Sequence, residues 1–196
     1  MQVPVSLSKS LEMDRPIYMG NSIGGHLAAD LSLHYTDKFR AIIGLEAALY
    51  TPYGRPDVWN DPRVSNAFKS MSMYGLMAPT APEKYRRETL WVCNQGAPPV
   101  FKGDLYYYSV DHDLQETAQQ IDTSQVGVYL LTGEYDWAST PERSEELAAP
   151  NKGAKYLTMQ GLGHFPMSED PERCLEFVEP ILNDIWESRF QSNLQT

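Results

Sequence analysis

Cysteine is scarce in this sequence, and its scarcity limits both cross-linking and redox chemistry. Cys93 and Cys174 are the only cysteines among 196 residues, and they do not form a CxxC pair. This pattern favours reduced, buried thiols in a cytoplasmic setting, with a single disulfide between them as the alternative.

Long apolar runs and excess positive charge are also lacking. No run approaches the roughly 20 residues that span a bilayer, and residues 1–14 show no hydrophobic signal-peptide core. We therefore expect no membrane association. A formal net charge of -10 argues against nucleic acid as a partner. With 42% hydrophobic residues and no repeats, the chain suits one soluble domain with its own core.

The motif GNSIGG at residues 20–25 follows a short apolar stretch at 15–19 that predicts a strand. A helical pattern comes next, with one apolar face formed by Leu27, Leu31 and Tyr35. Ser22 therefore lies in a tight strand-to-helix joint, where flanking side chains would clash. Gly20 and Gly24 remove that clash. This pattern is a G-x-S-x-G nucleophile elbow in the structural context that would expose a reactive hydroxyl.

Strand and helix patterns alternate on both sides of a middle segment of different composition. Further buried strands are predicted at 40–45, 126–131 and 154–159. The segment 51–124 is instead crowded with proline, methionine and aromatic residues. We expect an α/β fold in which residues 1–50 and 125–196 form a mostly parallel sheet flanked by helices. Residues 51–124 would be an inserted, mostly helical cap.

Candidate catalytic groups follow the predicted strands. Ligands bind at the carboxyl ends of strands in open α/β sheets. His164 follows the last strand, where a neutral imidazole can take up and return a proton. Asp136 follows the third strand and is the preferred acid to orient that imidazole, with Glu134 and Glu46 as rivals.

Three motifs occur in the order serine, acid, histidine: GNSIGG at 20–25, LTGEYD at 131–136 and GLGHF at 161–165. In this order the chain resembles α/β-hydrolase-fold serine hydrolases over essentially its whole length. The resemblance implies a Ser22–His164–Asp136 triad, with the backbone N–H of Ile23 in the oxyanion hole. The GNSxGG form of the elbow is similar to that of cap-bearing esterases and carbon–carbon-bond hydrolases.

The position of the elbow departs from the family pattern, because the family places several strands before it. The loop that supplies a second oxyanion N–H has no counterpart before Ser22, and the strand leading to Ser22 should be an edge. A shortened chain, a second chain that supplies the missing part, and a binding module without catalysis are the open explanations. The first is preferred. A homo-oligomer could form through the exposed edge.

The expected function is cleavage of an ester or related carbonyl substrate through an acyl-enzyme. A truncated or impaired module that binds a ligand or needs a partner chain is the alternative, and within enzymes a carbon–carbon-bond hydrolase. The substrate should be a small apolar molecule that contacts Trp137, Phe165 and Trp91. No cofactor and no metal are expected, because the adjacent Asp111, His112 and Asp113 are poorly spaced to converge on one ion.

Overall fold

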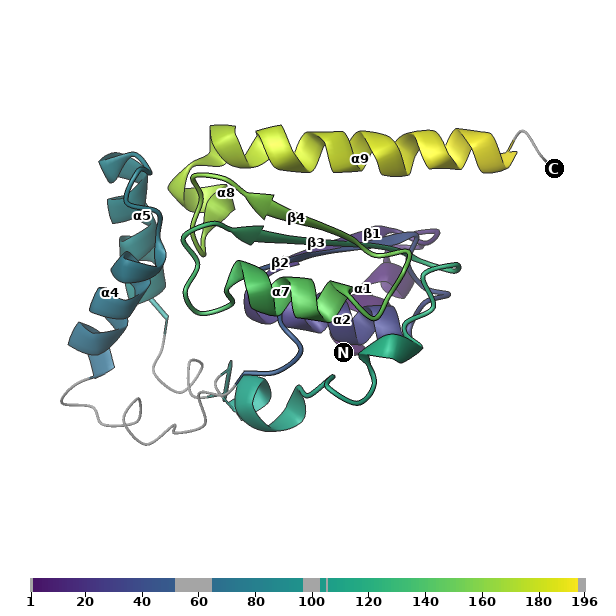
Figure 1. Cartoon of the computed structure of the whole chain (residues 1–196), viewed down its shortest axis with the longest axis horizontal. Helices are drawn as coiled ribbons and strands as arrows, with labels where there is room; N and C mark the ends of the chain where they lie inside the picture. The colour runs from purple at the N-terminus through teal and green to yellow at the C-terminus, as the bar shows by residue number, and fades with distance from the viewer. Residues whose placement is uncertain (1, 52–64, 97–102, 105, 194–196) are drawn as a thin grey trace.

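The computed structural model describes residues 2–51, 65–96, 103–104 and 106–193 (Figure 1). Part of the predicted insertion at 51–124 therefore lies outside the described residues.

Four parallel strands form the sheet, in the order β1-β2-β3-β4. They are β1 (Ile17–Asn21), β2 (Ala41–Leu45), β3 (Gly127–Gly133) and β4 (Lys155–Met159). β2 is buried along its whole length and β3 nearly so, whereas β1 and β4 lie at the edges and are partly exposed. The predicted α/β fold with a parallel sheet is confirmed.

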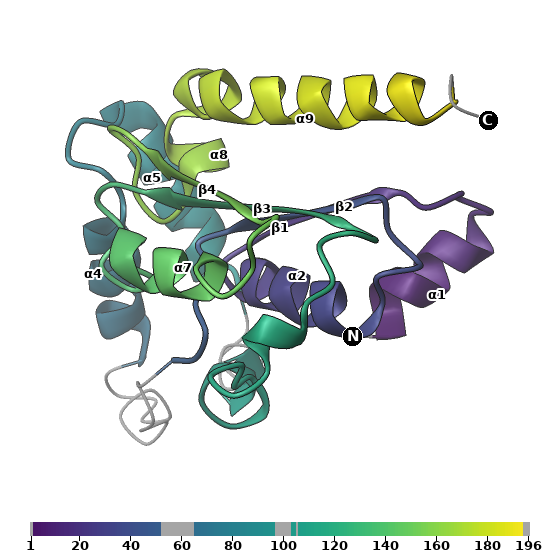
Figure 2. The ribbon, with the colours of Figure 1, turned by 45° about the vertical axis from the view of Figure 1, so that its right-hand side comes forward.

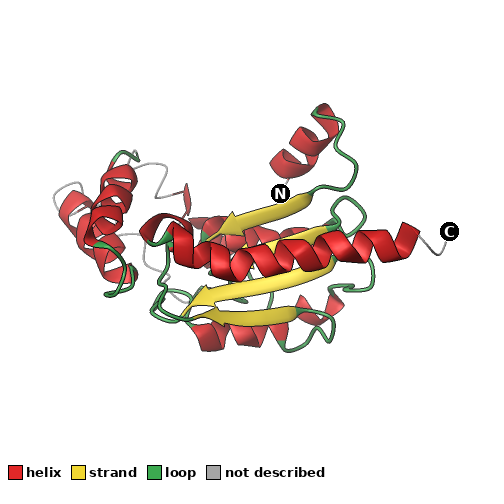
Figure 3. Cartoon of the chain, turned by 90° about the horizontal axis from the view of Figure 1, so that it is seen from above, coloured by secondary structure: helices red, strands yellow, loops and turns green. Residues whose placement is uncertain are grey.

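Helices cover both faces of this sheet (Figures 1 and 3). On one face lie α2 (Ile23–His34) and α7 (Pro141–Ala148), and on the other lies α9 (Pro171–Asn193). The first helix, α1 (Gln2–Ser10), lies beyond the β1 edge of the sheet (Figure 3). Side chains alternate between the faces along a strand, so the sheet supplies two cores. The α2 side includes Ala28, Leu31, Ile42, Val128, Leu130 and Leu147. The α9 side includes Ile43, Leu45, Leu131, Met159, Val178 and Ile185.

The described parts of the segment between β2 and β3 are largely helical. α4 (Ser65–Leu76) and α5 (Glu83–Asn94) pack together beyond the carboxyl ends of the strands (Figures 1 and 2). A π-helical turn η1 (Tyr107–Asp111) and a 3-10 turn η2 (Ala118–Gln120) lead into β3. The short helix α8 (Pro166–Glu169) follows β4 and contacts α5.

Both cysteines are free thiols, with Cys174 buried and Cys93 partly exposed. The alternative of a disulfide between them is therefore wrong. Among the helices in the described ranges, none combines the length and apolar character needed to cross a membrane.

Helix α2 approaches the sheet so closely that glycine is required at two positions of the motif. A Cβ on Gly20 would lie 2.4 Å from the Gly24 carbonyl oxygen, and one on Gly25 would lie 2.0 Å from the Leu45 carbonyl oxygen. At Gly24 the nearest atom would be the Tyr18 hydroxyl at 3.6 Å, an ordinary contact. The prediction was right for Gly20, but the second glycine that the packing demands is Gly25 and not Gly24.

Replacing Gly25 by alanine should force α2 away from β2. Overpacking of this kind costs about 1–3 kcal/mol, so the free energy of unfolding should fall by at least that amount in a urea titration. Gly24→Ala is the matched control. It should leave stability unchanged or raise it by up to about 1 kcal/mol, because alanine favours a helix over glycine. Equal stability of the two variants would contradict the close approach.

Candidate active site

Ser22 occupies the turn between β1 and α2, and its backbone is strained. Its φ of 56° and ψ of −115° lie in a region that residues with a side chain rarely adopt. The Ser22 N–H donates to the Leu45 carbonyl at 2.9 Å, which ties the turn to β2. Ile23 begins α2, so its N–H has no partner within the helix ladder and lies at the positive end of the helix.

Three side chains from three loops form one chain of hydrogen bonds. The Nε2 atom of His164 lies 2.8 Å from Ser22 Oγ, and its Nδ1 atom lies 2.7 Å from Asp136 Oδ2. Asp136 and His164 are both buried. These are the three residues that the sequence order singles out, and parallel strands bring them to one edge of the sheet.

The surroundings of Asp136 favour its ionised form. Burial raises its pKa, but the neighbouring His164 imidazole and the hydrogen bonds to the carboxylate outweigh burial and hold the pKa below its usual range. Two of those bonds come from the backbone N–H groups of Ala138 at 2.8 Å and Ser139 at 3.2 Å. An ionised Asp136 can hold the Nδ1 proton of His164 and stabilise an imidazolium.

Two polar side chains that sequence reasoning did not assign hold the His164 loop in place. The Asn21 amide donates to the His164 carbonyl at 3.0 Å. The Glu169 carboxyl accepts from the backbone N–H of Gly163 and, at 3.3 Å, from that of Ala78. Asn21 stands inside the GNSIGG motif, beside Ser22, whereas no pattern in the sequence marks Glu169.

The rival acids occupy different places. Glu134 is exposed and accepts the Gly161 N–H at 2.9 Å, away from the imidazole. Glu46 is fully buried beside Asp136, and burial together with the Asp136 charge raises its pKa well above the usual range. Neither rival makes the hydrogen bond to His164 that Asp136 makes.

The three aromatic candidates differ in their distance from this chemistry. The Phe165 ring packs edge-on against the His164 ring, with centroids 4.9 Å apart. Trp137 is 49% exposed, and its Nε1–H donates to the Gly75 carbonyl at the end of α4 at 2.9 Å. Trp91 lies on α5 with 68% of its surface in solvent, and its contact with a substrate stays a prediction.

The remaining buried histidines serve packing around the elbow. His26 Nδ1 lies 3.0 Å from the Ser22 carbonyl oxygen, and burial together with His112 lowers the pKa of His26 to about 3. The His112 ring spans the Asp30 carboxylate at 3.2 Å and the Ala48 carbonyl at 2.9 Å. His112 is therefore directed away from a cluster with its sequence neighbours.

Within the described ranges, one group of side chains could in principle hold a metal ion. Glu46, Asp136 and His164 offer ligand atoms that lie within 4.8 Å of one another. Both imidazole nitrogens already make hydrogen bonds, to Asp136 and to Ser22. A metal ion would have to break one of these bonds, so the geometry suits proton transfer better.

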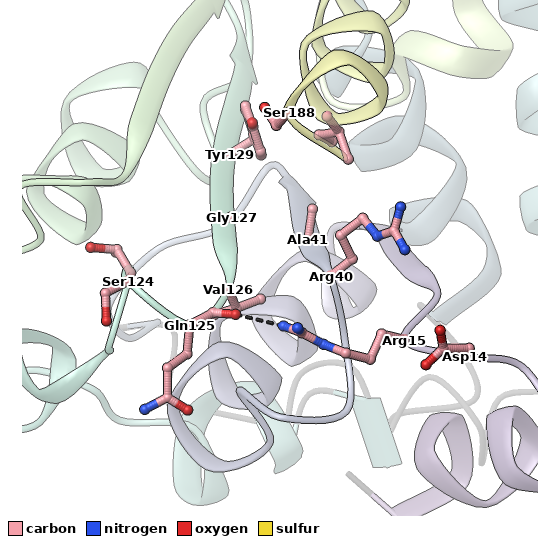
Figure 4. Close-up of a pocket in the computed structure, with 12 residues that line it drawn as sticks. Asp14, Arg15, Arg40, Ala41, Ser124, Gln125, Val126, Gly127, Tyr129 and Ser188 are labelled. Carbon is pink, nitrogen blue, oxygen red and sulfur yellow. Dashed lines mark hydrogen bonds between the residues drawn. The ribbon is translucent and has the colours of Figure 1, made fainter. Parts of the chain in front are cut away.

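A pocket of about 460 Å³ lies at the opposite end of the sheet (Figure 4). It is lined by Ala41 and Gly127, the first residues of β2 and β3. The Arg15 guanidinium enters it and donates to the Gln125 carbonyl at 2.6 Å. It is therefore separate from the hydrogen-bonded serine, histidine and aspartate.

No protein-family model matches the sequence, and no curated protein is significantly similar to it. Solved structures do match. An esterase from Thermogutta terrifontis has a TM-score of 0.78 at 17% identity, covering 93% of this chain and 70% of the esterase. An enol-lactonase from Burkholderia xenovorans LB400 has a TM-score of 0.74 at 20% identity, covering 92% and 70%. Est816, an enzyme that degrades N-acyl homoserine lactones, has a TM-score of 0.74 at 21% identity, covering 91% and 72%.

These similarities show the fold, which is that of the α/β hydrolases, as the resemblance in the sequence implied.

The strain at Ser22 can be measured as stability. Ser22→Gly and Ser22→Ala both remove the hydroxyl, but only glycine adopts a positive φ without a steric penalty. The glycine variant should therefore be more stable than the alanine variant by about 1 kcal/mol, after the extra chain entropy of glycine is subtracted. Urea denaturation of the two variants checks this difference. If alanine were the more stable, the turn would not be strained at Ser22.

Proposed function

We propose that this protein is a serine hydrolase that cleaves an ester or related carbonyl substrate through an acyl-enzyme. The observation that carries the proposal is the continuous hydrogen-bond chain from Ser22 Oγ through His164 to Asp136, at 2.8 and 2.7 Å. A serine hydroxyl is a weak nucleophile unless an adjacent base takes its proton. In this arrangement His164 is the base, and Asp136 orients it.

In the first half of the reaction, Ser22 Oγ forms a bond to the substrate carbonyl carbon while its proton passes to His164 Nε2. The tetrahedral intermediate then collapses, the bond to the leaving oxygen breaks, and His164 returns the proton to that oxygen. Asp136 stays ionised throughout and stabilises the imidazolium. The product of this half is an ester between Ser22 and the acyl group.

In the second half, a water molecule gives a proton to His164 Nε2 and attacks the acyl carbon. Collapse of this second intermediate restores the Ser22 hydroxyl with the proton held by His164, and releases the acid. The oxyanion of each intermediate would be held by the Ile23 N–H at the positive end of α2.

Two contacts support the proposal that the segment 51–124 acts as a cap over the substrate. The last turn of α4 meets the Trp137 side chain through the Gly75 carbonyl, and the His164 N–H donates to the Leu76 carbonyl at 2.9 Å. The helices beyond the strand ends are thus tied to both loops that carry the acid and the base. Phe165 beside the imidazole favours an apolar substrate.

The named reactions of the neighbours, ester and lactone cleavage, begin with attack on a carbonyl carbon, which suits this site. Carbon–carbon-bond hydrolysis is the alternative among enzymes, because it uses the same electrophile. Two free cysteines are consistent with a cytoplasmic location, which we also propose.

A fluorescent fluorophosphonate should label the wild-type protein, because an activated serine attacks its phosphorus and loses the fluoride. Ser22→Ala should not be labelled, while Ser188→Ala, on the surface of α9, should be labelled like the wild type. Asp136→Asn should react about 10⁴-fold more slowly, since the amide favours the wrong imidazole tautomer. Initial rates on short-chain nitrophenyl esters provide the second measurement. A wild-type protein that is inert to both reagents would refute the hydrolase.

The second candidate function is that of a module that needs a partner chain, and the exposed edge strand β1 favours it. In the part of the chain that the structure describes, β1 pairs only with β2. Its Ile17 and Met19 side chains are 40% and 51% exposed. An exposed apolar edge strand is a template for pairing with another chain.

If a second copy covers this edge, light scattering should report twice the mass of one chain. The ester hydrolysis rate per chain should then fall on dilution through the dissociation constant. Met19→Lys should give the mass of a single chain, because a charge on the edge opposes strand pairing. The dependence on a second copy would be excluded if the wild type were a monomer and its hydrolysis rate per chain did not change with concentration.

A further inference from the structure

Glu46 is a buried acid with a strained backbone, and the proposed mechanism assigns it no step. It follows β2 directly, is 0% exposed, and has a φ of 57°. A side-chain-bearing residue persists at positive φ only where its surroundings hold it there, and such positions cluster at functional sites. This position therefore calls for a reason beyond packing.

The contacts of Glu46 all lead toward the acid of the site. The Gly133 N–H donates to both carboxyl oxygens of Glu46, at 3.1 and 3.2 Å, and a carboxyl oxygen of Glu46 lies within 4.8 Å of one of Asp136. Gly133 ends β3, just before the loop that carries Asp136. Glu46 thus binds the backbone at the start of the Asp136 loop, and its carboxyl group lies beside that of Asp136.

Two carboxyl groups that share a hydrogen bond need one proton between them. Asp136 accepts from His164 Nδ1, from Ala138 N–H and from Ser139 N–H, so an anion is well solvated there. Glu46 has a single shared N–H. The negative charge therefore belongs on Asp136 and the proton on Glu46.

Burial and the neighbouring carboxyl groups also favour the protonated form of Glu46. Burial comes first, then the Asp136 charge, and the Glu169 carboxyl on α8 adds to both, so the pKa of Glu46 is raised despite the Gly133 bond. Tyr156 on β4 is a further ionisable neighbour. The His164 ring lies within the same 4.8 Å cluster but donates its Nδ1 proton to Asp136.

We propose that Glu46 is a positioning residue: its protonated carboxyl donates an O–H hydrogen bond to Asp136 and holds Oδ2 of Asp136 against His164 Nδ1. This inference rests on the proposed function for its kinetic consequences. Glu46 does not touch the substrate, and it acts through the orientation and charge of Asp136. The hydrogen-bonded series at the carboxyl ends of the strands then has four members: Ser22, His164, Asp136 and Glu46.

The role predicts a specific response to pH. While Glu46 keeps its proton, the arrangement holds, and as the pH rises through the raised pKa of Glu46 the donor is lost and a second anion appears beside Asp136. The hydrolysis rate of the wild type should therefore fall on the alkaline side. Glu46→Gln keeps an N–H donor toward Asp136 and an oxygen toward Gly133, but it does not ionise.

The kinetic test compares kcat and KM of three variants across the pH range, with the intact protein and nitrophenyl esters. Glu46→Ala should lower kcat about ten- to hundredfold, as loss of a partner that orients a functional group does elsewhere, with KM unchanged. Glu46→Gln should lose much less kcat than Glu46→Ala and should lack the alkaline fall. Glu134→Gln, the exposed acid near the same loop, is the matched control and should keep the wild-type profile.

Two spectroscopic measurements test the same contact without needing turnover. The infrared difference spectrum of wild type minus Glu46→Gln at neutral pH should contain the carbonyl band of a protonated carboxylic acid. The low-field proton signal of the His164–Asp136 hydrogen bond should persist in Glu46→Gln and shift or vanish in Glu46→Ala. If Glu46→Ala does not fold, the infrared band and the Glu46→Gln profile still decide the matter.

The outcomes separate this inference from the proposed function. If the protein is inert to fluorophosphonate but shows the infrared band and the altered proton signal, the proposed hydrolase function is refuted and the Glu46–Asp136 contact is supported. An active protein in which Glu46 is ionised at neutral pH, or in which Glu46→Ala retains the wild-type kcat and pH profile, would overturn the positioning role.

Discussion

The hydrogen bond of 2.7 Å between His164 Nδ1 and Asp136 Oδ2 is the contact around which this edge of the sheet is organised. It joins the loops that follow β4 and β3, so it requires those strands to be neighbours and parallel. The Asn21 amide holds the carbonyl of the same histidine, and the backbone of the acid's loop supplies further donors. Without this bond the imidazole would have no fixed tautomer and the Ser22 hydroxyl no oriented acceptor.

The distribution of charge at the carboxyl ends of the strands depends on how many hydrogen-bond donors each carboxyl group has. Three buried carboxyl groups, on Glu46, Asp136 and Glu169, lie near one imidazole, and three adjacent anions in a low-dielectric interior would repel strongly. Donors from two backbone amides and the imidazole converge on Asp136, whereas burial raises the pKa of Glu46 and of Glu169. This distribution favours the negative charge on Asp136, directly behind His164, where it suits stabilisation of an imidazolium.

Two of the four residues other than glycine that have a positive φ in the described ranges lie at this end of the sheet, and the other two, Glu12 and Arg15, precede β1. Ser22 and Glu46 both have a positive φ, and each directly follows a strand, β1 and β2 respectively. The close packing of α2 on β2 at Gly25 leaves the turn at Ser22 little room to relax. Rigid strands therefore hold two polar side chains in orientations that an unconstrained loop would abandon.

The sequence alone determined the layout. Short apolar runs predicted each strand to within two residues at both ends, for example 126–131 against the observed Gly127–Gly133. The order of motifs at strand ends singled out Ser22 and His164 and favoured Asp136 over Glu134 and Glu46 as the acid. Only the tertiary structure decided which acid faces the imidazole, because the direction of a loop side chain depends on contacts such as the Ala138 N–H that grips Asp136. For the same reason the demand for glycine at Gly25, the exposure of Trp91 and the burial of Glu46 beside Asp136 were beyond the sequence: each depends on how closely distant segments approach.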